Sequence, residues 1–150
     1  MSQLKQQLYN LCNEYLSHRM ASIQKKIQEA QEAANNEEKS SAGDKYETGR
    51  EMMQQEVNMN LTQLNETRKM KLVLDQINPF GKSNTAMAGS IVYTDQGNYY
   101  IAISAGKLVV DNVIYVAISA AAPIGAKFIG QERGAVIVLN GKKFAIENLE

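Results

Sequence analysis

The fold is decided at residues 78–84, where the chain is Asn78-Pro79-Phe80-Gly81-Lys82-Ser83-Asn84. Proline lacks a backbone N–H and forces the residue before it away from helical geometry, so a helix that arrives here has to end. Composition changes at the same place, because both prolines and eight of the ten glycines come from Pro79 onward. Residues 79–84 are therefore predicted to link two parts of different architecture, residues 1–78 and residues 85–150.

Two amphipathic helices are predicted before the linker. Glutamine, glutamate, lysine, leucine and methionine, which favour helices, dominate this part of the chain. Apolar residues recur there every three or four positions, which predicts one helix over about 3–36 and a second over about 45–77. The apolar stripes are Leu8, Cys12, Leu16, Met20, Ile23, Ile27, Ala30 and Ala34 in the first helix, and Met53, Val57, Leu61, Leu64, Met70, Leu74 and Ile77 in the second, with a weaker stretch around Thr67.

The two helices are expected to pack against each other. A polar, turn-prone segment at 35–43 separates them and is short enough to reverse the chain. Each apolar stripe needs a partner, so residues 1–78 are predicted to form an antiparallel coiled-coil hairpin with its turn far from the rest of the chain. At about 1.5 Å per residue the hairpin would be roughly 45 to 50 Å long.

The part after the linker is predicted to be a small antiparallel sheet, which makes the fold class α+β. Valine, isoleucine and tyrosine occur there in short bursts separated by turn signals, of which Asn140-Gly141 is the strongest. A short helix or turn is expected over 125–130. The predicted strands are Ser90–Thr94, Asn98–Ser104, Lys107–Val110, Val113–Ile118, Ala135–Leu139 and Lys142–Asn148.

Composition excludes several classes of protein. No stretch approaches the roughly twenty apolar residues that a membrane span needs, so no contact with a membrane is expected. The single cysteine, Cys12, cannot form an intramolecular disulfide, and the first thirty residues lack the apolar core of a signal peptide, so a cytoplasmic location is expected. Sixteen basic and sixteen acidic residues cancel, which argues against stable DNA binding by the chain alone.

The charge is nevertheless unevenly distributed. Residues 29–56 contain eight acidic and three basic residues, a net charge of −5, with an acidic tip near 37–47. The flanking helical segments, 1–28 and 57–84, contain eight basic and three acidic residues, a net charge of +5. This distribution suits a rod that brings carboxylates to a cation while its shaft faces phosphates. Solvated helix faces without any partner are the alternative explanation.

The sharpest local motif is Gly43-Asp44-Lys45-Tyr46-Glu47, at the start of the second predicted helix. One interpretation is purely structural, because Asp44 as N-cap with Glu47 three residues later is a variant of the capping box. The other interpretation is functional, because two carboxylates three positions apart can share one hard cation such as Mg²⁺. Two carboxylates alone bind Mg²⁺ weakly, so a partner would have to supply the remaining ligands.

Two segments resemble the Gre family of bacterial transcript-cleavage factors. Gly43, Asp44 and Glu47 match the Gly-Asp-x-x-Glu segment at the family's coiled-coil tip, and the chain from Pro123 to Gly134 is similar to a Pro-Ile-x-x-x-x-(Leu/Ile)-Gly-x-x-x-Gly segment of its FKBP-like domain. The resemblance implies an FKBP-like head at 85–150. It also implies that the rod enters the secondary channel of bacterial RNA polymerase while the head docks on the channel rim.

The resemblance further implies specific roles for residues. Asp44 and Glu47 would act as catalytic and metal-binding carboxylates, holding a Mg²⁺ shared with the polymerase, whose own nuclease activity then shortens the 3′ end of backtracked RNA. The protein would stimulate that activity without being an enzyme itself. Arg19, Lys25 and Lys26 are the candidate contacts to the extruded RNA, and Pro123, Ile124 and Gly125 the candidate contacts to the polymerase rim.

The chain also departs from the family pattern, which leaves two other hypotheses open. Thr48-Gly49-Arg50 replaces the usual Asn-Ala-Glu after the acidic pair, Ala122 replaces a serine, and Ala135 replaces an aspartate. A regulator that occupies the secondary channel without promoting cleavage is one alternative. A coiled-coil scaffold, whose rod binds a second copy or another helix, is the other. His18 has no neighbouring histidine or cysteine cluster and is predicted to be exposed rather than to bind metal.

Overall fold

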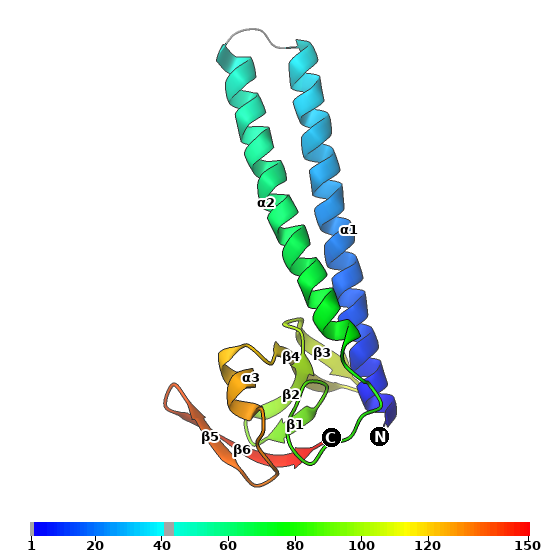
Figure 1. Ribbon diagram of the computed structural model, residues 1–150, viewed down its shortest axis with the longest axis vertical. Coiled ribbons are helices and arrows are strands. Elements are labelled where there is room, and N and C mark those ends of the chain that lie inside the picture. The colour runs from blue at the N-terminus through cyan, green and yellow to red at the C-terminus, as the bar shows by residue number, and fades with distance from the viewer. Residues whose placement is uncertain (1, 41–43) are drawn as a thin grey trace. The chain divides into compact units, whose positions relative to one another are not determined.

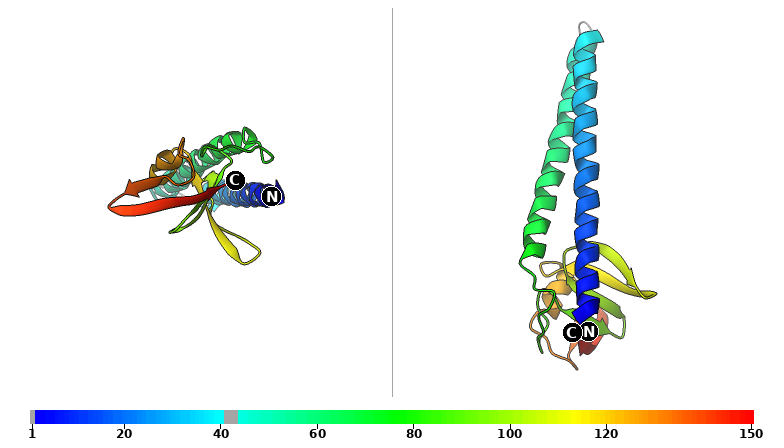
Figure 2. Two further views of the ribbon diagram at one scale, coloured as in Figure 1. Left: turned by 90° about the horizontal axis from the view of Figure 1, so that it is seen from below. Right: turned by 90° about the vertical axis from the view of Figure 1, so that its right-hand side faces the viewer.

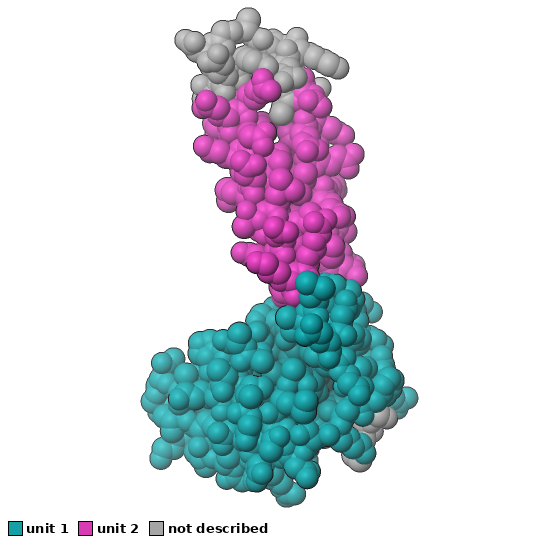
Figure 3. Space-filling view, viewed as in Figure 1, with its two compact units in different colours: residues 1–15, 71–150 teal, residues 16–70 magenta. Residues whose placement is uncertain are grey.

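The computed structural model describes residues 2–40 and 44–150, and the side chains of these except at 2, 34, 36–40 and 44–48. The protein is α+β: two long helices, α1 (Ser2–Ser40) and α2 (Asp44–Asp75), precede a six-stranded, mostly antiparallel sheet (Figure 1). The chain forms two compact units (Figure 3). One comprises residues 16–70, and the other comprises residues 1–15 together with residues 71–150.

In the unit of residues 16–70, the two helical segments lie side by side and run in opposite directions (Figures 1 and 2). The apolar stripes predict the buried residues well, with one error: Leu61 is 47% exposed, and Asn60 is buried instead. The buried positions of α2 alternate in steps of three and four, which keeps a stripe on one side of a helix. A step of four residues from Val57 would place Leu61 away from the buried side of α2. The buried residues of this unit are Leu16, Ile23, Ala30, Val57, Asn60, Leu64 and Thr67.

The helix ends differ slightly from the predicted ones. Helix α1 continues to Ser40, so the polar residues 35–40, predicted to belong to the turn, are helical. Asparagine, glutamate and lysine cost less within a helix than glycine or proline, neither of which occurs at 35–40. Helix α2 ends at Asp75, and the amides of Gln76 and Ile77 then bond to carbonyls three residues back, which tightens the last turn.

The sheet contains β1 (Ile91–Thr94), β2 (Gly97–Ala102), β3 (Gly106–Val110), β4 (Val113–Ser119), β5 (Val136–Leu139) and β6 (Lys142–Leu149), in the spatial order β3-β4-β2-β1-β6-β5. All six predicted strands are present. The prediction of a purely antiparallel sheet is wrong at one pair, because β2 and β4 run parallel, with Asn98 opposite Tyr115. Strand β3 forms a hairpin with β4 and carries the chain back, so that β4 starts in the same direction as β2.

The turn residues explain two of the hairpins. Asp111 and Asn112 join β3 to β4 with φ values of 51° and 65°, and Asn140 and Gly141 join β5 to β6 with φ values of 52° and 79°. Two consecutive residues with positive φ form the type I′ turn, whose twist matches that of the flanking strands. Asparagine, aspartate and glycine adopt this conformation at the lowest cost, so these turns were predictable from the sequence.

One face of the sheet is covered by the short helix α3 (Pro123–Phe128), which begins two residues before the segment predicted as a helix or turn. An aromatic cluster lies beneath it: the ring centroids of Tyr99 and Phe128 are 5.3 Å apart, and Phe144 lies 6.3 Å from each of them. The core on this face is completed by Ala86, Val92, Ile101, Ile118, Ile137 and Ile146.

The opposite face carries Tyr100, which is fully buried, as expected from the alternation that places Tyr99 on the α3 side. Cys12 and Tyr9 of α1 lie close enough to Tyr100 to influence its hydroxyl electrostatically. The first residues of α1 and the sheet belong to the same compact unit. Residues 1–15 of α1 therefore belong to the β-rich unit.

Candidate functional site

The two acidic residues of the motif, Asp44 and Glu47, lie at the start of α2. Helix α1 ends at Ser40 and α2 begins at Asp44, so only residues 41–43 separate the helices. Glu47 follows in the first turn of α2, and because positions three apart share one side of a helix, Asp44 and Glu47 belong to the same face. Gly43 and the side chains of Asp44 and Glu47 lie outside the described residues. The binding of a shared Mg²⁺ by the carboxylates of Asp44 and Glu47 therefore remains a prediction.

The donor set at these two positions suits a hard cation. Carboxylate oxygens are the ligands that Mg²⁺ prefers, and Mg²⁺ is usually held by one or two carboxylates together with water and phosphate oxygens. Acidic residues in the first turn of a helix are also stabilised by the positive end of its dipole. The backbone of α2 is thus compatible with both the metal-binding and the capping interpretation of this motif.

The three predicted RNA contacts lie on α1 within the unit of residues 16–70. Lys26 is exposed, and Lys25 is 78% exposed and forms only a long ion pair with Glu29, with 4.0 Å between the charged atoms. Such exposed pairs contribute little and leave the lysine available to another anion. Arg19 is half-buried and already interacts within the protein. Because they are seven positions apart, Arg19 and Lys26 share one side of the helix.

The three predicted rim contacts form the first turn of α3, and they differ in their exposure to solvent. Pro123 is exposed at the first helical positions, where its missing N–H costs nothing. Ile124 is half-buried against the core. Gly125 is buried, and a Cβ placed there would lie 2.0 Å from the Ser119 carbonyl oxygen. The N-cap residue Ala122 provides no side-chain hydrogen bond. Pro123 is therefore the most accessible of the three, and Gly125 lets α3 approach the end of β4.

Cys12 and His18 have the burial that the sequence predicts: Cys12 lies on the apolar stripe of α1, and His18 is exposed. Cys12 is fully buried, and this burial raises the pKa of its thiol to about 12, which disfavours the nucleophilic thiolate. His18 is exposed on α1. Within the part of the chain whose side chains are described, no three histidine, cysteine, aspartate or glutamate side chains gather closely enough to hold a metal ion.

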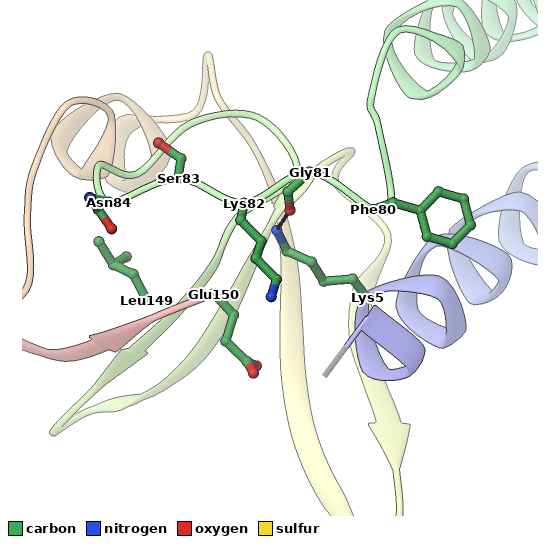
Figure 4. Close-up of a pocket in the computed structure, with 8 residues that line it drawn as sticks. All are labelled: Lys5, Phe80, Gly81, Lys82, Ser83, Asn84, Leu149 and Glu150. Carbon is green, nitrogen blue, oxygen red and sulfur yellow. Dashed lines mark hydrogen bonds between the residues drawn. The ribbon is translucent and has the colours of Figure 1, made fainter.

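A small pocket in the unit of residues 1–15 and 71–150 was not predicted from the sequence. It encloses about 200 Å³ (Figure 4). Lys5 is only 6% exposed there, and its ammonium group donates a hydrogen bond of 2.6 Å to the Gly81 carbonyl oxygen. Lys5 lies three positions before Leu8, on the apolar stripe of α1, and a charged residue on such a stripe is a signal that could have been noticed. The pocket is lined by Lys5, Phe80, Gly81, Lys82, Ser83, Asn84, Leu149 and Glu150.

Three charged groups determine the electrostatics of this pocket. Burial lowers the pKa of Lys5, the carboxylate of Glu150 partly restores it, and the positive charge of Lys82 lowers it further. One carboxylate oxygen of Glu150 accepts a hydrogen bond of 2.5 Å from the Tyr93 hydroxyl. Burial and this bond to Glu150 both raise the pKa of Tyr93, which therefore remains a neutral donor.

No protein-family model matches the chain, and no curated protein matches it. The candidate site is therefore defined by the residues of this chain: the acidic pair Asp44 and Glu47, the basic residues of α1, and the start of α3. Among the described helices, none is long and apolar enough to cross a lipid bilayer.

Proposed function

We propose that this protein is a Gre-like transcription elongation factor, which binds bacterial RNA polymerase and stimulates the polymerase's own Mg²⁺-dependent cleavage of backtracked RNA. In this proposal, α1 and α2 pair as an antiparallel coiled coil that enters the secondary channel. Residues 85–150 form an FKBP-like head that docks on the channel rim. The proposal combines the α+β element order with the two motifs that resemble the family.

The observation that carries the proposal is the short connection between two long helices. Helix α1 has 39 residues and α2 has 32, and the second begins at Asp44, the first acidic residue of the Gly-Asp-x-x-Glu motif. A capping role alone would suit the start of any helix. An acidic pair at the junction of two helices of this length is what a probe that carries carboxylates into another protein's catalytic centre requires.

The chemistry follows from the two carboxylates. Asp44 and Glu47 contribute oxygen ligands to a Mg²⁺ whose other ligands come from the polymerase and the RNA phosphate. In a two-metal hydrolysis, the cations activate the attacking water and stabilise the leaving oxygen. This chain positions the two carboxylates and supplies no other catalytic group. The exposed ammonium groups of Lys25 and Lys26, together with Arg19, attract the extruded RNA through its phosphates.

A second function, regulation of the polymerase without cleavage, is favoured by one observation at the same helix. Gly49 is helical, close after the acidic pair. Glycine inside a helix costs about 1 kcal/mol relative to alanine, which weakens the first turns of α2. With a less stable start of α2, the chain would still occupy the secondary channel, but Asp44 and Glu47 would position a metal ion less precisely.

The experiment that tests the proposal replaces both carboxylates by their amides, Asp44→Asn with Glu47→Gln. Asparagine still caps a helix and glutamine can still complete a capping box, so the variant loses charge while keeping the local structure. We expect it to bind polymerase as the wild type does and to lose its stimulation of 3′-end cleavage in backtracked complexes. The matched control is Glu51→Gln with Glu56→Gln, because both of these glutamates are exposed on the same helix.

The outcomes separate the hypotheses. Cleavage stimulated by wild type and control, and absent in the double amide variant, supports the proposal. Polymerase binding by the wild type without cleavage supports the regulator. Self-association of the wild type without polymerase binding supports the scaffold and contradicts both polymerase functions.

A further inference from the structure

The pocket beside Lys5 contains two ammonium groups that form no ion pair with any described residue. Lys5 uses one of its three N–H donors on the Gly81 carbonyl oxygen, and Lys82 makes no hydrogen bond or ion pair within the described part of the chain. Figure 4 shows both side chains directed into the space below the Gly81 carbonyl. The two positive charges are close enough for Lys82 to disfavour the charged form of Lys5. Like charges held together in this way attract an anion between them.

The surroundings strengthen this attraction. Lys5 is almost completely buried, and charged side chains are rarely buried unless they are paired. The pocket is also lined by the apolar residues Leu149 and Phe80, of which Phe80 is 65% exposed, so water is excluded mainly around Lys5. The side chains of Ser83 and Asn84 add neutral polar groups at its edge. The site thus offers charge, hydrogen-bond donors and partial exclusion of solvent.

Glu150 also lines the pocket and opposes the binding of an anion. Its carboxylate accepts the hydrogen bond from Tyr93, which directs one oxygen towards that hydroxyl and disperses part of its charge. Neither lysine lies within ion-pair distance of Glu150 among the described residues, although its charge is felt at Lys5. Among the side chains that line the pocket, two ammonium groups therefore face the single carboxylate of Glu150.

We infer that this pocket binds a small phosphate-bearing anion between Lys5 and Lys82. A dianionic phosphate neutralises both ammonium groups, and lysine is a common point-charge ligand of phosphate. The volume of about 200 Å³ is sufficient for a phosphate or diphosphate group. The site is independent of the acidic pair and of the function proposed for it.

The inference is tested by titrating the whole protein with inorganic pyrophosphate, using calorimetry and the backbone amide shifts of Gly81, Lys82 and Ser83. We expect saturable binding at one site with shifts centred on these residues. Lys82→Met should weaken the affinity by about tenfold, which corresponds to loss of one close charge contact in a partly screened site. Glu150→Gln should strengthen it by about threefold, because the amide removes the repulsion and still accepts from Tyr93. A nucleoside triphosphate serves as a second probe: equal affinity identifies a free phosphate group as the ligand, and tighter binding identifies a nucleotide.

The matched control is Lys107→Met, which removes an exposed lysine on β3 that does not line this pocket. We expect it to bind pyrophosphate as the wild type does. The inference is overturned if neither probe binds saturably, if Lys82→Met and Lys107→Met weaken binding equally, or if Glu150→Gln weakens it. Equal weakening by Lys82→Met and Lys107→Met would mean that the probe is attracted diffusely by surface charge. Weaker binding to Glu150→Gln would mean that the probe does not share the pocket with Glu150.

Discussion

At position 125 the protein has no room for a side chain. The nearest atom to a Cβ built on Gly125 is the carbonyl oxygen of Ser119, 2.0 Å away, and backbone atoms of Ser119 and Ala120 follow at 3.0 and 3.2 Å. Backbone atoms cannot rotate aside as the end of a side chain can. The glycine is therefore required for α3 to pack against the end of β4, whatever the head binds.

Gly125→Ala is expected to destabilise the protein by about 3 kcal/mol or more, at or above the upper end of ordinary overpacking. The measurement is the free energy of unfolding by urea, followed by tyrosine fluorescence. Gly81→Ala is the matched control, because a Cβ at Gly81 would lie at an ordinary 3.4 Å from the Asn78 carbonyl oxygen. That variant should change stability by less than about 1 kcal/mol. Equal stability of the two variants would contradict the observed packing of α3.

Cys12 gives a prediction that depends on pH. Burial raises the pKa of its thiol from 9.0 to about 12, so the fold favours the neutral thiol. The stability that this preference contributes is fully present below pH 9 and is lost as the pH rises from 9 towards 12. The free energy of unfolding should fall over this window, and it should fall less in Cys12→Val, which removes the contribution of the thiol and keeps those of Lys5 and the buried tyrosines.

The same burial should protect the thiol from reagents. In the native protein at pH 8, a disulfide reagent such as dithionitrobenzoate should leave Cys12 unmodified, and in denaturant the reaction should be complete. Rapid modification of the native protein would contradict the burial of this residue, and identical pH slopes in wild type and Cys12→Val would contradict its raised pKa.

At the scale of elements, α2 carries a polar residue within its buried stripe. Asn60 is 7% exposed, and its side-chain nitrogen has no hydrogen-bond partner among the residues whose side chains the structure describes. Thr67, one heptad further, is also buried, but its hydroxyl bonds to the Gln63 carbonyl oxygen at 2.8 Å. An unsatisfied buried donor costs about 1 to 3 kcal/mol, whereas a satisfied hydroxyl costs little.

Asn60→Leu should therefore raise the free energy of unfolding by about 1 to 2 kcal/mol. The control, Thr67→Val, should leave it within about 1 kcal/mol of the wild type, because the Gln63 carbonyl keeps its helical hydrogen bond. Thermal and urea unfolding of both variants check this. A loss of stability in Asn60→Leu would show that the asparagine has a partner or fixes the register of the helices, as single buried asparagines do in coiled coils.

The elements were largely predictable because their signals are local. Alternating apolar residues together with Asp95-Gln96-Gly97, Asp111-Asn112 and Asn140-Gly141 placed six strands within two residues of their observed ends. The error at Leu61 arose because a four-residue step was assumed where the helix uses a three-residue step to Asn60, and an asparagine carries no apolar signal. Lys5 was missed for a related reason: its burial depends on the Gly81 carbonyl, 76 residues away.

At the scale of the whole molecule, long-range pairings set the limit of prediction. The parallel pair of β2 and β4 depends on how the β3–β4 hairpin folds back, which no turn residue specifies by itself. The inclusion of residues 1–15 in the β-rich unit depends on buried contacts such as those near Tyr100. The acidic motif was found from the sequence because its spacing is local, whereas the role proposed for it depends on a partner and has to be tested in the complex.

The distribution of charge belongs to the same scale. The acidic segment 29–56 carries −5, and residues 1–28 and 57–84 on either side of it together carry +5. A neutral chain with this distribution suits a partner that presents metal ions at one end of a channel and nucleic acid along its wall. The central claim is therefore that the acidic pair acts by supplying carboxylate ligands to Mg²⁺ in the polymerase active centre.

The most direct test of this claim is the Mg²⁺ dependence of RNA cleavage in backtracked elongation complexes, measured with saturating amounts of each protein. The wild type is predicted to lower the Mg²⁺ concentration required for half-maximal cleavage and to raise the maximal rate. Asp44→Asn with Glu47→Gln is predicted to leave both values at those of polymerase alone. If wild type and variant bind equally and shift the Mg²⁺ requirement by the same amount, the carboxylates do not hold the metal and the account is contradicted.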